Sequence, residues 1–340
     1  MIIEKIKKLI SKNSIAQNTS FSKQFYCLGT IISLTAYGAS AEIAINKAQE
    51  RLNDIDDKMS VFKPSSEISK INSLSGKQFE KVSFDTYFVI KKAVHFSELS
   101  EGTFDPTIRP LVKLWNIGKD NFRIPTNYEI KEILNLINYK NIIFDENSSS
   151  IMLKKEGQSL DVGGIAKGYA ADEINKIFKK YKIKSGIIDL GGNIYAVGQK
   201  PNKKNWNIGI QNPIRIRGSY VGILSLSHKS IVTSGGYERY STENNKTFHH
   251  ILNPKTGYPA KNELVSTTII SDKSIDGDGL STGVYIMGLQ KSIKLIENLD
   301  GVDAIFITKD NKIYLTSNIK DKFRLTDTNF SLQEDYYYEK

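Results

Sequence analysis

The stretch DVGGIAKGYAADEI, residues 161–174, decides the fold that we expect for this chain. It predicts the end of a strand over residues 159–161, a turn at Gly163 and Gly164, and then a helix. Apolar residues recur at helical spacing through that helix, namely Ile165, Tyr169, Ile174, Ile177, Phe178 and Tyr181. Lys167 falls in its first turn, where backbone N–H groups, the positive helix end and an ammonium group would converge on a phosphate. The alternative is a plain turn with an exposed lysine, because glycine is first of all a turn residue.

Composition narrows the class of protein. The 340 residues carry a formal net charge of +10, but the lysines are scattered and form no basic stripe with aromatic residues, so we expect no nucleic-acid partner. Cys27 is the only cysteine, which excludes an internal disulfide and a cysteine-based zinc site. No run of eighteen apolar residues occurs, and residues 1–20 lack the apolar block of a secretory signal. Phe25 and Tyr26 are too bulky for a lipoprotein cleavage site before Cys27, so the sequence predicts a cytoplasmic protein without a transmembrane segment.

The order of predicted elements indicates one α+β domain with a mixed β-sheet core and helices on its faces, because hairpins outnumber β-α-β units. We place this domain at residues 23–325, between an N-terminal extension (1–22) and a C-terminal tail (326–340). The extension predicts a short amphipathic helix, either loosely attached or docked on a membrane or partner. The sequence further predicts strands over 25–37 and 264–271, a hairpin over 142–153 and helices over 39–59 and 83–99. In the helix over 39–59, the residues expected to point inward are Ile43, Leu52, Ile55 and Met59. We also expect a structured loop over 102–118 and a capping box formed by Thr126 and Glu129.

Two polar groupings suggest chemistry. Asp276 and Asp278 stand at the start of a predicted helix, where they could simply cap it, yet Asp278 and Thr282 are four residues apart and so share one face. A carboxylate and a hydroxyl at that spacing suit Mg²⁺, which needs few protein ligands when phosphates and water supply the rest. His249 and His250 fall in a predicted strand and would point to opposite faces. One of them is a candidate general base or phosphate contact, with a structural histidine as the alternative.

Six segments resemble the ApbE family of flavin transferases, in the family's order. They are YCLGT (26–30), MSVFKPSSEISKIN (59–72), GTFDPTIRPLVKLW (102–115), DVGGIAKGYA (161–170), TSGGYERY (233–240) with HILNPKTG (250–257), and DGLSTGVYIMG (278–288). Any one segment is a weak signal, whereas six in order are a specific one. The resemblance implies an ApbE-like fold with an FAD cleft between two lobes. It also implies a Mg²⁺-dependent enzyme that splits FAD, attaches FMN through a phosphoester to a threonine of an acceptor flavoprotein, and releases AMP.

The resemblance also implies site residues. FAD contacts would come from Cys27, Phe62, Thr103, Phe104, Asp105, Asp161, Lys167 and His250, with Phe62 stacking on the flavin or the adenine ring. Metal ligands would be the Gly164 carbonyl, Asp278 and Thr282. Lys167 would lie near the phosphates, because phosphoryl transfer depends on charge neutralisation and positioning. The general base would be Asp278 or His250, and the sequence leaves both open.

Four positions depart from the family pattern. Cys27 stands where the family usually has Met, Phe62 where it has Tyr, Gly164 where it has Ala, and Asn253 where it commonly has Asp. The last change removes a charge and argues against a catalytic role at that position. Two alternatives to transfer remain: Mg²⁺-dependent hydrolysis of FAD to FMN and AMP, and a carrier that holds FAD without turnover. The acceptor's identity and the choice between monomer and homodimer stay open.

Overall fold

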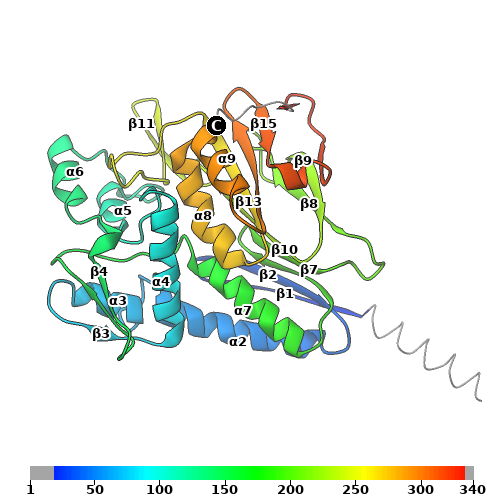
Figure 1. Ribbon diagram of the computed structural model, residues 1–340, viewed down its shortest axis with the longest axis horizontal. Helices are drawn as coiled ribbons and strands as arrows, with labels where there is room; N and C mark the ends of the chain where they lie inside the picture. The colour runs from blue at the N-terminus through cyan, green and yellow to red at the C-terminus, as the bar shows by residue number, and fades with distance from the viewer. Residues whose placement is uncertain (1–18, 334–340) are drawn as a thin grey trace, which may run out of the picture.

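The computed structural model describes residues 19–333 and is built around a large β-sheet (Figure 1). In spatial order its strands are β1 (Ser20–Cys27), β2 (Thr30–Tyr37), β6 (Ser185–Leu190), β7 (Asn193–Gly198), β10 (Lys229–Gly235), β13 (Leu264–Ser271), β14 (Val302–Thr308), β15 (Lys312–Leu315) and β17 (Ser331–Leu332). Neighbouring strands are antiparallel except β15 and β17, so the sheet is mixed. The predicted α+β class with a helix-flanked mixed sheet is confirmed.

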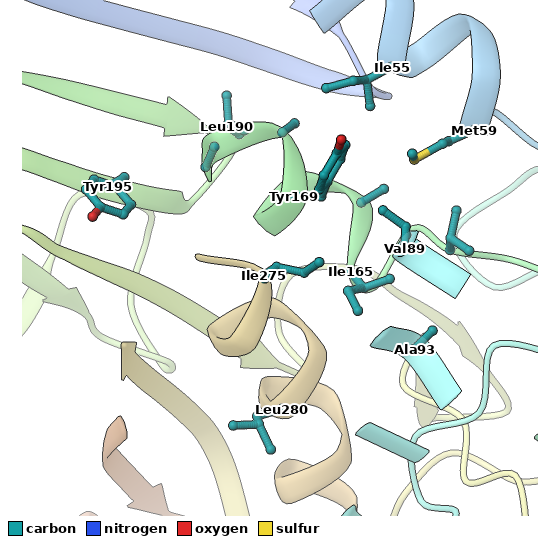
Figure 2. Packing of buried hydrophobic residues seen from close by; sticks show 14 of the residues in the cluster. Ile55, Met59, Val89, Ala93, Ile165, Tyr169, Leu190, Tyr195, Ile275 and Leu280 are labelled. Carbon is teal, nitrogen blue, oxygen red and sulfur yellow. The ribbon is translucent and has the colours of Figure 1, made fainter. Parts of the chain in front are cut away.

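Helices cover one face of this sheet. They are α2 (Ala41–Met59), α7 (Ala166–Lys180), α8 (Ser274–Met287) and α9 (Leu289–Glu297), while α4 (Phe84–Leu99) packs on α2 and α8. The buried apolar residues of α7 include Tyr169, Ile174 and Phe178, as the helical periodicity predicts. Figure 2 shows Ile165 and Tyr169 at the start of α7, between Ile275 of α8 and Val89 of α4. This apolar layer sets the spacing between the helices that carry the candidate site.

A second layer covers the opposite face. The small sheet β8 (Trp206–Gln211), β9 (Tyr220–Leu226) and β16 (Phe323–Leu325) buries Ile210 and Leu224 in one cluster with Ile231 and Ile305 of the large sheet. The remaining elements are α3 (Glu67–Ser73), α5 (Arg109–Trp115), α6 (Asn127–Leu134), the 3-10 turns Tyr139–Asn141 and Ser317–Ile319, the small sheet β3 (Glu80–Lys81), β5 (Ser150–Leu153) and β4 (Ile142–Asp145), and the hairpin β11 (Tyr240–Glu243) and β12 (Lys246–His249). The strands of the large sheet from β7 to β15 are thus covered on both faces, whereas β1 at the edge has an exposed face.

Several local predictions are confirmed. Thr126 and Glu129 form the expected capping box, Ser83 precedes α4, and β4 and β5 form the expected hairpin. Two predictions near the N-terminus are wrong. Residues 25–37 form parts of two strands rather than one, because Leu28 and Gly29 take positive φ values of 51° and 72° and turn the chain between β1 and β2. Ile43 is 57% exposed instead of inward.

Other boundaries also differ from the expectation. Residues 159–161 form no strand, and α5 lies inside the segment 102–118 that we expected to be a loop. β12 ends at His249, so His250 lies outside it. β1 begins at Ser20 and β17 lies within the predicted tail, so secondary structure extends beyond residues 23–325. The predicted N-terminal helix lies outside the described residues. Within residues 19–333, no helix is both long and apolar enough to cross a membrane.

Candidate active site

The N-terminal parts of α7 and α8 lie next to each other, and Lys167 of α7 and Asp278 of α8 form a charged pair there. The Lys167 ammonium donates a hydrogen bond to the Gly163 carbonyl at 2.8 Å and lies 3.7 Å from Oδ1 of Asp278. Asp278 is buried, and its Oδ2 accepts a hydrogen bond from the backbone N–H of Gly168 at 2.8 Å. The structure therefore brings together two of the predicted catalytic residues, one from each helix.

Glycine at position 168 makes this contact possible. A Cβ atom there would lie 2.4 Å from the Ser274 carbonyl oxygen and 2.7 Å from Cβ of Asp278. Both distances are shorter than van der Waals contact, so any side chain would force the helices apart. This role of Gly168 could not be predicted from the sequence, because a glycine within a helix gives no sign of what packs against it.

Thr282 follows Asp278 by one helical turn, as the spacing predicts. Its Oγ1 lies 3.3 Å from Oγ of Ser234, and Ser234 also donates to Ser281 at 3.0 Å. Ser234 comes from the end of β10, which runs through Thr233 and Ser234 to Gly235. A strand end thus adds a hydroxyl to the polar face of α8.

The residues at this junction fit a hard divalent cation in their chemistry. Their donors are a carboxylate, hydroxyls and backbone carbonyls, and such oxygen ligands suit Mg²⁺ better than zinc. The Gly163 carbonyl and Oδ1 of Asp278 already lie around a positive charge, the Lys167 ammonium. Across residues 19–333, no group of three or more His, Cys, Asp or Glu side chains gathers for a metal. A metal here would depend on this mixed oxygen set together with phosphate or water.

The turn before α7 links this pair to an exposed aromatic ring. Asp161 accepts a hydrogen bond from the Gly163 N–H at 2.9 Å, and its Oδ2 lies 3.6 Å from Nη1 of Arg109. Arg109 is buried, donates to the Val61 carbonyl at 2.9 Å, and places its guanidinium 5.5 Å from the centre of the Phe62 ring. Phe62 itself is 74% exposed. Arg109 thus connects the aromatic ring to the Gly163–Gly164 turn.

Two cations lie beside Phe62 that the sequence did not predict there. Arg109 stands within a quoted motif, but nothing in the sequence places it against Phe62, 47 positions earlier. Lys119 lies with its ammonium 5.4 Å from the same ring. The Phe62 ring is open to solvent and can stack on a planar ligand, while Arg109 and Lys119 supply positive charge beside it.

Thr103, Phe104 and Asp105 form a buried support under the site. Thr103 donates from Oγ1 to the Gly283 carbonyl of α8 at 2.9 Å, the Phe104 ring lies against Gly164, and Cβ of Phe104 lies against Gly283. The Asp105 carboxylate accepts hydrogen bonds from Thr107 and from the Tyr139 N–H, and burial raises its pKa. These contacts hold α8 and the Gly163–Gly164 turn in place, so direct contact of the three residues with FAD stays a prediction.

His250 is oriented by a single backbone carbonyl. The Arg239 carbonyl accepts from the His250 N–H at 3.0 Å and lies 3.1 Å from Nδ1. Because a carbonyl only accepts, Nδ1 carries the proton and Nε2 keeps its lone pair. Burial, together with the positive charges of Arg239 and Lys167, lowers the pKa of His250 to about 4. His250 is therefore a neutral acceptor at pH 7.

His249 and Cys27 face other partners. His249 lies against the Ala260 carbonyl through Nε2 at 3.0 Å, and its ring packs edge-on against Tyr285. Cys27 is buried at the end of β1, with its sulfur 3.7 Å from Oδ1 of Asn53 on α2. Burial and the nearby Asp56 raise the pKa of its thiol to about 11, so the thiol stays protonated. A contact between Cys27 and FAD stays a prediction.

Two cavities lie away from these residues. One of about 450 Å³ is lined by residues that include Pro110, Lys113 and Arg123, and one of about 510 Å³ by residues that include Tyr37 and Trp206. None of the predicted site residues lines either cavity. The predicted FAD cleft between two lobes therefore stays a prediction.

Comparison with known proteins gives the class of protein to which this fold and site belong. Residues 28–306 match the ApbE family. A Klebsiella pneumoniae protein named FAD:protein FMN transferase is 32% identical over 318 residues, which cover 94% of this chain and 98% of the relative. A Treponema pallidum protein of the same name is 30% identical, with 94% and 92% covered.

Solved structures agree with the sequence matches. The ApbE protein of Thermotoga maritima superimposes with a TM-score of 0.83 at 31% identity, covering 89% of this chain and 99% of that one. The flavin transferase ApbE of Vibrio cholerae gives a TM-score of 0.80 at 25% identity, with the same coverage. This chain belongs to the ApbE family.

Proposed function

We propose that this protein is an FAD:protein FMN transferase that acts at the junction of α7 and α8. Membership of the ApbE family and full-length similarity to proteins named FAD:protein FMN transferase support the activity. The single observation that carries the placement is the contact of Lys167 with both the Gly163 carbonyl and Asp278. It gathers a cation and metal-type oxygens at a helix N-terminus, which is a favourable position for a phosphate.

In this proposal Asp278, Thr282 and a carbonyl of the Gly163–Gly164 turn, with Gly164 as the predicted ligand, would hold Mg²⁺. The metal, when bound, would neutralise charge on the pyrophosphate. Lys167 exchanges its contact with Gly163 for a phosphoryl oxygen and stabilises the charge that develops there. Phe62 stacks on a ring of FAD, with Arg109 beneath it, and Asp161 keeps the connecting turn in place.

The transfer step forms one bond and breaks one. The oxygen of an acceptor threonine attacks the phosphorus of the FMN half, the pyrophosphate P–O bond breaks, and AMP leaves with the bonding electrons. The threonine proton must go to a base. We propose His250 over Asp278, because Nε2 of His250 keeps a free lone pair while Asp278 already accepts from Gly168 and lies beside Lys167.

Intact-mass analysis of purified protein with FAD, Mg²⁺ and an acceptor carrying the family's threonine target tests this function. Transfer predicts an acceptor mass gain of one FMN group, an equal amount of AMP, and loss of both with EDTA. AMP and free FMN without attachment, with several acceptors, would favour hydrolysis instead. FAD that stays bound and intact would favour a carrier. An acceptor whose threonine is replaced by valine is the matched control.

A further inference from the structure

Asp172 lies on α7 five residues after Lys167, and its carboxylate contacts α8. Oδ1 accepts a hydrogen bond from the Ser274 N–H at 2.8 Å, and Oδ2 accepts one from the Ile275 N–H at 3.0 Å. These are the first two N–H groups of α8, which have no acceptor within their own helix. The N-cap residue Lys273 supplies no side-chain cap. A carboxylate from the neighbouring helix therefore caps α8.

A second polar contact runs between the same helices in the opposite sense. Asp172 of α7 accepts from the backbone of α8, whereas the backbone N–H of Gly168 on α7 donates to Asp278 of α8. The two contacts are separated by one helical turn on each helix. Together they fix α8 against both sliding along α7 and rotation about its own axis.

Other contacts make this arrangement rigid. The Ser274 hydroxyl donates to Asn193 of β7 at 2.8 Å and accepts from Ser230 of β10 at 2.8 Å. Ile275 packs in the apolar layer beside Ile165, as Figure 2 shows. The first turn of α8 is thus held by the sheet, by the apolar layer and by Asp172, and Asp278 follows directly after it.

We propose that Asp172 is a positioning residue for the transfer site: it holds the first turn of α8 so that Asp278 lies beside Lys167. This inference rests on the proposed function. Asp172 does not touch the reacting atoms, because both of its oxygens accept from α8. Its effect reaches the site through Asp278. A residue that orients a metal ligand in this way affects metal affinity by about 10- to 100-fold when it is removed.

Asp172→Asn tests the proposal, because it keeps the shape but turns an NH₂ group towards one of the two N–H donors. Asp276→Asn is the matched control, since Asp276 lies in the same turn of α8 but pairs with Lys92 of α4. Two readouts do not depend on turnover: Mn²⁺ binding to the protein by electron paramagnetic resonance, and hydrogen exchange of the Gly168 amide, which reports the position of Asp278. Near-ultraviolet circular dichroism checks that each variant is folded.

We expect Asp172→Asn to weaken Mn²⁺ binding by about 10- to 100-fold, to speed exchange at Gly168, and to recover transfer activity at high metal concentration. The control should match the wild type. If Asp172→Asn does not fold, Asp172→Glu keeps both acceptor oxygens and displaces α8 by one methylene group. The same shifts are expected in that variant.

Wild-type Mn²⁺ affinity in a folded variant would overturn the proposal, whether or not Gly168 exchange changes, because Asp172 would then serve stability alone. If the wild type binds no Mn²⁺ and transfers no FMN, the proposed function fails and this role fails with it. If the wild type transfers FMN and the folded variants keep wild-type Mn²⁺ affinity, the positioning role of Asp172 fails while the proposed function stands.

Discussion

Replacing Gly168 with alanine tests how closely activity depends on the contact between α7 and α8. The added Cβ would lie 2.4 Å from the Ser274 carbonyl oxygen and 2.7 Å from Cβ of Asp278. Ordinary contact begins near 3.4 Å, so the helices must separate by about 1 Å at this point. That separation lengthens the hydrogen bond from Gly168 to Asp278 and moves Asp278 relative to Lys167.

The stability effect of this change should be small. Overpacking costs about 1–3 kcal/mol, and alanine regains about 1 kcal/mol over glycine within a helix. The net free energy of unfolding should therefore fall by about 0–2 kcal/mol, measured by urea denaturation. Activity should fall far more, by about 100-fold, because a misplacement of 1 Å is costly in a preorganised site.

Single-turnover transfer assays with saturating FAD give the activity, and FAD binding is followed by fluorescence. Binding should change little, because the atoms that the new Cβ would meet belong to Ser274, Ile275 and Asp278 and not to Phe62 or Arg109. Lys179→Ala, on the exposed face of the same helix, is the control and should behave as the wild type. Wild-type transfer by a folded Gly168→Ala protein would refute the argument that this close approach sets the site.

Three further predictions concern the metal, the ring and the base. Asp278→Ala should abolish Mg²⁺-dependent turnover while leaving FAD binding, and full activity in that variant would rule out the metal assignment. Phe62→Ala should weaken FAD binding by about fivefold, the effect of losing about 1 kcal/mol of stacking, whereas Phe62→Tyr should keep it; equal affinity in all three proteins would argue against stacking. His250 should make stability depend on pH: its folded pKa of about 4 lies below the unfolded value near 6.5, so the unfolded chain takes up the proton first. That contribution, about 3 kcal/mol, is present above pH 6.5 and is lost as the pH falls towards 4, and His250→Asn should flatten the corresponding fall in melting temperature.

Local patterns in the sequence were enough to predict much of the fold. The helical spacing of apolar residues identifies α7, the Thr126–Glu129 pair identifies the start of α6, and the four-residue spacing of Asp278 and Thr282 places both on one face. Each of these depends on residues within about one helical turn. The turn between β1 and β2 was missed because one glycine among β-prone residues is a weak turn signal.

Contacts between distant segments could not be predicted in this way. From the sequence alone, Asp172 is an ordinary carboxylate on a helix. Its role depends on Ser274 of α8, which lies 102 positions further along the chain. From the sequence alone, Arg109 is expected in a loop, whereas in the structure it begins α5 and its guanidinium contacts the Phe62 ring. The structure also engages the Gly163 carbonyl with Lys167, whereas the family resemblance pointed to Gly164 as the metal ligand. Such choices are decided by tertiary packing and not by sequence spacing.

The most direct test of the account is the rate at which FMN becomes attached to an acceptor, followed by intact mass for the wild type, Lys167→Met and Lys176→Met. Lys176 lies on the exposed side of α7 and pairs with Glu173, so it is the matched control. We expect Mg²⁺-dependent attachment by the wild type and by Lys176→Met, and a loss of about 100- to 1,000-fold in Lys167→Met. Attachment at the wild-type rate by Lys167→Met, or none by the wild type, would contradict this expectation.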